Sequence, residues 1–146
     1  MHLSIRSALA ADAPALASLL GELGYPASAE QVAVRAQRLL GRDGAPSTDQ
    51  VFVATRDREV LGLIALHRFT GLHADADVAL ITALVVAERA RGLGVGRRLV
   101  DRAVEAAREW GCGRLMVTTH IRRADAHAFY ERIGFELTGR RYARPV

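Results

Sequence analysis

Lysine is absent from this chain of 146 residues, cysteine occurs once, and aromatic residues make up 5% of the composition. A single cysteine excludes an intrachain disulfide framework, so we expect a reduced, cytoplasmic protein in which Cys112 is a small core residue. No apolar run approaches the roughly 18 residues that a membrane span requires, and the first residues lack the apolar segment of a signal peptide. We therefore expect a soluble protein that has no membrane partner.

The positive charge comes entirely from arginine, and the formal net charge is +4. A bias toward Arg and Ala explains this charge without any function, although a positive surface attracts phosphates or nucleic acid. The arginines are spread over all predicted elements rather than along one stripe, and aromatics are few. We therefore expect no nucleic-acid partner, and we assign no metal site.

Half of the residues are apolar, which predicts a single α/β domain over residues 1–146 whose core needs neither disulfide nor metal. Hydrophobic periodicity predicts the element order β-α-α-β-β-β-α-β-α-β. The turn-rich stretch 41–50 is expected to be a surface loop. The expected strands are 3–8, the hairpin 51–69, 77–86, 114–120 and a terminal pair over 135–144, and the expected helices are 12–23, 28–40, 97–110 and 124–133.

Two capping patterns place the first helices. Asp12 stands directly before an apolar helical stripe and is predicted to be its N-cap. Ser28 followed by Gln31 is a capping-box signature for the second helix.

Three glycines, at positions 92, 94 and 96, fall within five residues of the stretch "ARGLGVGRRLV", between the strand 77–86 and a helix. A loop that enters a helix offers unpaired N–H groups and the positive end of the helix dipole, and Arg91 and Arg97 can add charge-assisted hydrogen bonds. The stretch therefore predicts a phosphate or pyrophosphate site, while a tight packing turn is the alternative explanation. Neither the dinucleotide fingerprint nor the Gly-Lys-Ser/Thr phosphate loop fits this spacing.

Two motifs carry a resemblance to a known family. The stretch "LVVAERARGLGVGRRLV", residues 84–100, resembles the signature of the GCN5-related N-acetyltransferases (GNAT), and Ala126 with "FYERIGF", residues 129–135, resembles the second signature. The chain is especially similar to small bacterial members such as aminoalkylphosphonate N-acetyltransferases. The resemblance implies a mixed sheet of six to seven strands, flanked by about four helices and splayed between the fourth and fifth strands.

The resemblance also implies acetyl-CoA as the acyl donor. The main chain of the fourth strand would bind the pantetheine arm, the glycine loop would bind the pyrophosphate, and Arg123 stands where many members have an Asn that contacts the cofactor. The cofactor-binding residues expected on this basis are Leu84, Val85, Val86, Arg91, Gly92, Leu93, Gly94, Val95, Gly96, Arg97 and Arg123.

The implied reaction is direct attack of a primary amine on the thioester in a ternary complex. The family's usual general acid falls on Tyr130, a phenol reasonably matched to a thiolate leaving group. The base is open, because Ala83 stands where some related members carry a glutamate. His67 and His120 are the candidates we would test first, since a histidine accepts protons near neutral pH.

The acceptor is also open. In the family the acceptor pocket usually forms from the first two helices, their connection and the loop between the third and fourth strands. Here these segments hold Glu22, Tyr25, Asp75 and Asp77, which would favour a cationic amine, whereas Arg68 would favour a phosphonate or carboxylate. The alternatives to a small-molecule transferase are a protein or peptide N-acetyltransferase and a non-catalytic acyl-CoA-binding sensor. A homodimer is possible.

Overall fold

The computed structural model describes residues 2–40, 48–119 and 124–146. The chain divides into two compact units, Met1–Met116 and Val117–Val146. In the described part of the chain, no helix is both long and apolar enough to cross a membrane.

The first unit contains a sheet and three α-helices in the predicted order. Residues 41–47, most of the expected surface loop, lie outside the described residues. The elements are β1 (Ser4–Ser7), the 3-10 helix η1 (Ala10–Asp12), α1 (Ala13–Leu23), α2 (Ala29–Leu40), β2 (Asp49–Arg56), β3 (Glu59–Phe69), β4 (Val78–Val86), the 3-10 helix η2 (Glu88–Ala90), α3 (Val95–Glu109) and β5 (Arg114–Val117).

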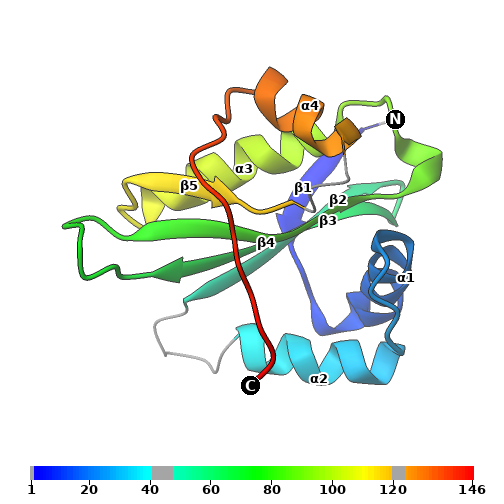
Figure 1. Cartoon of the computed structure of the whole chain (residues 1–146). Coiled ribbons are helices and arrows are strands. Elements are labelled where there is room, and N and C mark those ends of the chain that lie inside the picture. The colour runs from blue at the N-terminus through cyan, green and yellow to red at the C-terminus, as the bar shows by residue number, and fades with distance from the viewer. Residues whose placement is uncertain (1, 41–47, 120–123) are drawn as a thin grey trace. The chain divides into compact units, whose positions relative to one another are not determined.

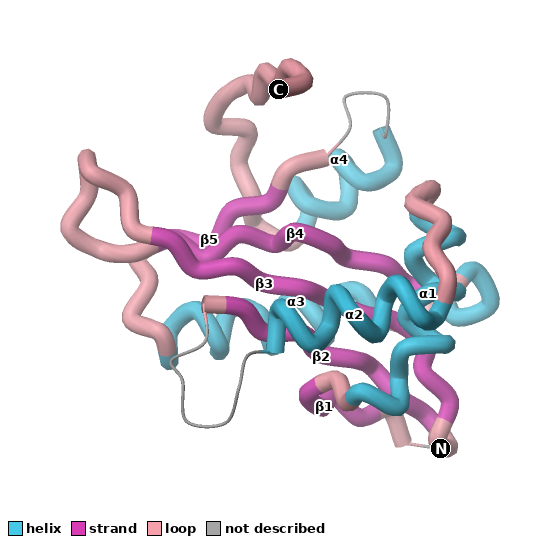
Figure 2. The backbone as a smooth tube through the Cα atoms, turned by 90° about the horizontal axis from the view of Figure 1, so that it is seen from below, coloured by secondary structure: helices cyan, strands magenta, loops and turns pink. Residues whose placement is uncertain are grey.

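The strands lie in the order β1-β2-β3-β4-β5, which Figure 2 shows from below. The first three pairings, β1 with β2, β2 with β3 and β3 with β4, are antiparallel. The predicted hairpin is confirmed, and its turn lies at Asp57 and Arg58, which both have positive φ angles, as a two-residue hairpin turn requires. β5 follows α3 and lies beside β4.

Helices cover both faces of this sheet (Figure 1). Alternate residues of β3 point to opposite faces. Leu63 and Ala65 face a cavity that α1 and α2 also line. A Cβ on Gly62 would instead lie 3.1 and 3.2 Å from the side chains of Leu99 and Val95 of α3, and 2.8 Å from the main-chain oxygen of Val85. The sheet is therefore sandwiched between α1 and α2 on one face and α3 on the other.

The start of α1 differs from the prediction. Asp12 does occupy the N-cap position, but its side chain makes no capping hydrogen bond to the helix. It accepts two hydrogen bonds from the Arg6 guanidinium, of 2.8 and 2.9 Å, and one of 2.7 Å from the N–H of Leu9. The bidentate pairing with a charged group is stronger than a neutral cap, so Asp12 ties β1 to the start of the helix.

The predicted capping box of α2 is confirmed. The Ser28 N–H donates to Oε1 of Gln31 at 2.9 Å, and the Gln31 N–H donates to Oγ of Ser28 at 3.1 Å. Both bonds are local in sequence, which explains why the sequence pattern predicts them.

The second unit contains α4 (Ala124–Arg132) and the segment that follows it. The predicted terminal strand pair over 135–144 is wrong, because residues 135–146, all of them described, form no strand. Within the described residues the sheet therefore has five strands rather than six to seven. Leu137 and Tyr142 are 90% and 86% exposed, so this segment buries too little apolar surface to hold a strand pair in water.

Candidate active site

The glycine loop between β4 and α3 has the backbone of an anion site. Gly92 and Gly94 have φ angles of +81° and +77°, which side chains other than glycine rarely adopt. Gly94 is the N-cap of α3 and makes no side-chain capping bond. A Cβ at either glycine would meet nothing within 4 Å. The glycines therefore serve the bend of the loop, and the space in front of them is open.

The electrostatics of the loop also favour an anion. The first turn of α3 contains no acidic residue, so nothing negative offsets the partial positive charge of the helix N-terminus. Arg91 and Arg97 are exposed, and within the described chain neither side chain has a hydrogen-bond or ion-pair partner. Leu93 is exposed, whereas Val95 is buried and anchors the helix to the sheet. Two charged donors thus flank uncapped helix amides.

The main chain of β4 alternates between its two edges. Val85 is paired with Leu63, and two residues further along the Ala87 N–H donates to the Leu61 oxygen at 2.8 Å. In an antiparallel ladder every second residue bonds to the partner strand. It follows that Val85 bonds to β3, while the N–H and C=O groups of Leu84 and Val86 point to the other edge of β4.

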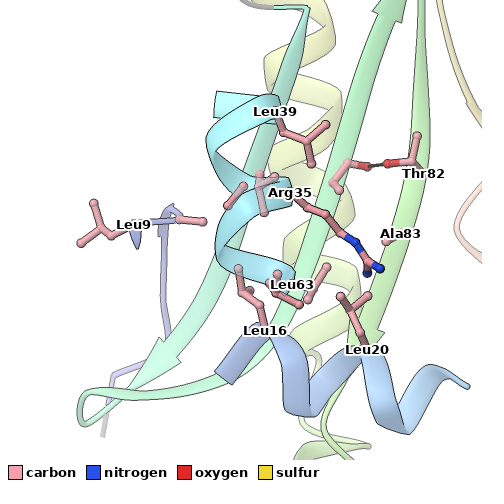
Figure 3. Close-up of a pocket in the computed structure, with 13 residues that line it drawn as sticks. Leu9, Leu16, Leu20, Arg35, Leu39, Leu63, Thr82 and Ala83 are labelled. Atoms are coloured by element: carbon pink, nitrogen blue, oxygen red, sulfur yellow. Dashed lines mark hydrogen bonds between the residues drawn. The ribbon is translucent and has the colours of Figure 1, made fainter. Parts of the chain in front are cut away.

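A cavity of about 170 Å³ lies on the α1 and α2 side of the sheet (Figure 3). Its walls come from both helices, from β2, β3 and β4 and from the segment after β1, and Arg35 is the one charged residue among the described lining residues. The lining consists of Ala8, Leu9, Leu16, Leu20, Val32, Arg35, Ala36, Leu39, Val51, Leu63, Ala65, Thr82 and Ala83.

A β-bulge in β4 contributes two residues to the cavity wall. Ala65 pairs with Ala83 and the next residue of β3, Leu66, pairs with Ile81, so Thr82 is the extra residue. The Thr82 hydroxyl donates to the Ala65 oxygen at 3.3 Å. The bulge therefore lets the neighbours Thr82 and Ala83 both line the cavity, next to the edge-facing main chain of Leu84.

His67, one of the two predicted base candidates, has an acidic partner. Its Nδ1 lies 3.1 Å from Oδ1 of Asp49, which is directly opposite on β2. The side chain of His67 is 40% exposed. Because alternate residues of a strand share a face, His67 lies on the same face of β3 as Ala65 of the cavity wall, about 7 Å further along the strand. The structure thus places an Asp-His pair on the cavity side of the sheet.

The four predicted acceptor residues are not brought together. The Glu22 carboxylate accepts a 3.0 Å hydrogen bond from the Glu88 N–H at the end of β4. Asp77, which directly precedes β4, accepts a 2.8 Å hydrogen bond from the Thr70 hydroxyl. The nine residues of β4 separate this carboxylate from that of Glu22 by roughly 26 Å. Tyr25 is 68% exposed, and Asp75 is exposed. None of the four is among the residues that line the cavity.

Tyr130 is held in the second unit by the end of α4. The Phe135 N–H donates to the Tyr130 oxygen at 2.9 Å and the Gly134 N–H to the Glu131 oxygen at 3.2 Å, with Gly134 at φ +100°. This is a Schellman motif, whose usual apolar contact is here the Tyr130–Phe135 ring pair, with centroids 5.6 Å apart. The "FYERIGF" signature thus encodes a helix end that orients Tyr130. His120 and Arg123, also expected in the site, lie outside the described residues.

Arg68, which was expected to bind a phosphonate or carboxylate of the acceptor, lies on the face of the sheet opposite to the cavity. Its guanidinium carbon is 5.3 Å from the centre of the Trp110 ring at the end of α3. Burial and the nearby Asp77 carboxylate raise the pKa of the Cys112 thiol, which Arg68 partly offsets. Among the described residues, no group of three or more His, Cys, Asp or Glu side chains is placed to hold a metal ion.

Comparison with known proteins identifies the family to which this fold and its glycine loop belong. Residues 16–135 match the family described as "Acetyltransferase (GNAT) family". The chain therefore belongs to the GNAT acetyltransferase family, as the two motifs predicted. The family uses acetyl-CoA as a co-substrate.

The chain is also similar to individual proteins in sequence or in fold. An aminoalkylphosphonate N-acetyltransferase of Salmonella typhimurium is 37% identical over 94 residues, which cover 64% of this chain and 61% of that protein, so the match spans less than two thirds of the relative. A structure of a transcriptional regulator from Bacillus halodurans C-125 is similar with a TM-score of 0.87 and 25% identity, over 99% of this chain and 100% of that one. A GNAT family acetyltransferase of Staphylococcus aureus shares the fold, with a TM-score of 0.82 at 17% identity and complete coverage of both chains, 100% each.

The sequence analysis missed three residues that the structure brings to this site: Arg35, Asp49 and Thr82. Arg35 stands at the edge of the apolar stripe of its helix, three residues after Val32 and four before Leu39, which also line the cavity. The pairing of Asp49 with His67 depends on the register of the hairpin, and the bulge at Thr82 leaves no mark in an all-apolar strand. Two usable signals were present: the helical spacing of Arg35 with Val32 and Leu39, and a hairpin connection at 57–59, which already places 49 near 67.

Proposed function

We propose that this protein transfers the acetyl group of acetyl-CoA to the primary amine of a small molecule, by direct attack within a ternary complex. The observation that carries the proposal is the arrangement around β4. The edge-facing peptides of Leu84 and Val86, the uncapped glycine loop after the strand and a small cavity beside Ala83 all adjoin this one strand. Donor-binding and acceptor-binding elements are therefore contiguous.

The donor would lie along β4 and its loop. The amides of Gly94 to Arg97 and the side chains of Arg91 and Arg97 would bind the pyrophosphate, through charge-assisted hydrogen bonds and the helix dipole. The outward N–H and C=O groups of Leu84 and Val86 would pair with the amides of the pantetheine arm as a neighbouring strand does. A backbone N–H at this edge would also stabilise the oxyanion of the tetrahedral intermediate.

The chemistry needs a base and an acid. The amine nitrogen forms a bond to the thioester carbon, and its surplus proton passes through water to Nε2 of His67, whose Nδ1 faces Asp49. The carbon–sulfur bond then breaks, and the thiolate takes a proton from the phenol of Tyr130. Asp49 is a positioning residue in this scheme, because it fixes the tautomer that leaves Nε2 free to accept a proton.

The size of the cavity supports a small acceptor. Pockets that hold drug-sized ligands measure about 300–1,000 Å³, whereas a dry cavity of about 150 Å³ holds benzene. The 170 Å³ cavity suits an acceptor of about that size more than a peptide chain. The Salmonella relative is named for a small amine acceptor, an aminoalkylphosphonate, which agrees with this choice.

Two variants test the proposal. Gly94→Glu places a carboxylate in the anion site and is expected to abolish acetyl-CoA binding in calorimetry. Gly94→Ala introduces the same backbone strain without the charge and serves as its control. Tyr130→Phe is expected to lower kcat about 100-fold while the affinity for acetyl-CoA stays within twofold, and the 86% exposed Tyr142 provides the matched control Tyr142→Phe.

Thiol release measured over a panel of amines decides between the transferase and its alternatives. Turnover of free small amines supports the proposal. Acetylation of peptides alone would replace it with a protein acetyltransferase. Acetyl-CoA binding without turnover on any amine or peptide would replace it with a sensor. Unchanged kcat in Tyr130→Phe would remove Tyr130 from the mechanism.

A further inference from the structure

The charge inside the acceptor cavity is positive and unbalanced. Arg35 is the one charged residue among the thirteen described residues that line the cavity, and the lining contains no acidic residue. Among the described residues Arg35 has neither an ion pair nor a hydrogen-bond partner. Arg6 and Arg89 of the same unit, by contrast, form ion pairs with Asp12 and Glu59. Arg35 is thus an unpaired cation on an otherwise apolar wall.

The side chain of Arg35 reaches across the cavity toward β4. Figure 3 shows its guanidinium reaching from α2 across to β4, where it lies between Leu20 of α1 and Ala83. Ala83 precedes Leu84, whose outward main chain we assign to the acyl donor. Arg35 is exposed, so its apolar stem lies along the cavity wall while its guanidinium reaches both the cavity and water.

We infer that Arg35 binds an acidic group of the acceptor, so that the substrates are short amines with a carboxylate or phosphonate at the other end. A guanidinium presents parallel N–H donors that match the oxygens of such groups bidentately. Leucine and alanine side chains would cover the short alkyl spacer. This inference rests on the proposed transferase function and adds the class of acceptor to it.

The same charge disfavours cationic amines, the acceptors that Glu22, Asp75 and Asp77 would favour. A diamine or polyamine would bring a second ammonium group against Arg35 with no carboxylate in the lining to offset the repulsion. A neutral alkylamine would fill the apolar part and leave the guanidinium without a partner. We therefore expect the order of kcat/KM to be anionic, then neutral, then cationic amine.

The test compares four amines of similar length: 3-aminopropanoate, 2-aminoethylphosphonate, propylamine and 1,3-diaminopropane. With the full-length protein and acetyl-CoA, at least one of the two anionic amines should exceed propylamine by about 10- to 100-fold in kcat/KM, as a charge-assisted pair permits. Arg35→Gln should remove this advantage while propylamine stays within about threefold. Arg35→Lys should restore part of it, and Arg35→Glu should make the diamine the better substrate.

The matched control is Arg38→Gln, because Arg38 is an exposed arginine on the same helix that does not line the cavity. Equal turnover of anionic and neutral amines by the unaltered protein, or an anionic preference that survives Arg35→Gln, would overturn the inference and leave the transferase intact. If no amine is turned over, calorimetry of the acetyl-CoA complex with the two anionic amines still decides. Binding that Arg35→Gln abolishes supports the inference, and absent or unchanged binding overturns it. Melting curves of all variants show whether each is folded.

Discussion

The carboxylate of Asp12 offers a sharp test of how β1 and α1 are held together. Asp12 is 8% exposed and accepts three hydrogen bonds, two from the Arg6 guanidinium and one from the Leu9 N–H. Asp12→Asn keeps the shape of the side chain but removes its charge. The amide NH2 of the asparagine would then face a donor, either the Arg6 guanidinium or the Leu9 N–H. The variant therefore loses its charge-assisted pairing and leaves part-buried donors without an acceptor.

The expected cost follows from these contacts. A hydrogen bond to a charged group contributes about 1.5–3 kcal/mol, and the partly exposed Arg6 can recover some of its loss from water. We expect Asp12→Asn to lower the free energy of unfolding by about 2–3 kcal/mol at pH 7. With an unfolding entropy of about 2.1 cal/mol/K per residue over 146 residues, this corresponds to a fall in Tm of roughly 8 °C.

The pH dependence gives the same test a second arm. The hydrogen bonds from Arg6 are the largest cause of a lowered pKa of Asp12 in the folded protein. A carboxyl group whose pKa is lower when folded than when unfolded stabilises the fold fully above its unfolded pKa of about 4, and this stabilisation is lost as the pH falls through the folded pKa. The gap between the unaltered protein and Asp12→Asn should therefore shrink below about pH 4.

Urea denaturation at pH 7 and at several values between pH 5 and pH 2 measures this gap. Asp101→Asn is the control, because Asp101 is exposed on α3 and has no partner among the described residues; it should change stability by less than about 0.5 kcal/mol. Equal stability of Asp12→Asn and the unaltered protein at pH 7, or a gap that stays constant down to pH 2, would refute the reasoning.

Two further predictions concern packing and the single thiol. Gly62→Ala should cost about 1–3 kcal/mol, because the new methyl group would meet the Val85 oxygen at 2.8 Å. Gly21→Ala should instead stabilise α1 by about 0.5–1 kcal/mol, since nothing lies within 4 Å there; urea denaturation checks both, and equal effects would contradict the close approach. Cys112 should react with iodoacetamide at higher pH than an ordinary thiol, because its pKa is raised. Asp77→Asn should shift that pH profile down and Arg68→Gln should shift it up, and profiles that coincide in all three proteins would rule out this electrostatic coupling.

Local patterns in the sequence predicted local structure well. The Ser28–Gln31 capping box, the hairpin over 51–69 and the glycine-led start of α3 each depend on residues close together in the sequence, and the structure contains all three. The two signature motifs predicted the family, because together they describe an anion loop and a helix end rather than one common turn.

Features that depend on distant parts of the chain were not predictable in this way. The role of Asp12 is set by Arg6 on another element, and the pairing of Asp49 with His67 is set by strand register. Which residue of α2 reaches the cavity depends on how the helix is rotated about its axis when it packs. The alternating polar and apolar residues at 135–144 predicted strands. In the structure this segment forms no strand, and its apolar residues Leu137 and Tyr142 are exposed.

The bulge at Thr82 explains how one strand could serve the two substrates of the proposed reaction. Before the bulge, even-numbered residues of β4 share a face with His67, since Leu80 pairs with it; after the bulge, odd-numbered residues share that face, since Ala83 pairs with Ala65. Side-chain direction and main-chain direction both alternate with a period of two residues. The extra residue therefore turns the small side chain of Ala83 toward the cavity and, in the same step, turns the peptide groups of Leu84 and Val86 to the outer edge. Without it, the larger Leu84 side chain would fill the acceptor cavity while its peptide pointed into the β3 ladder, so acceptor space and donor contacts would be lost together.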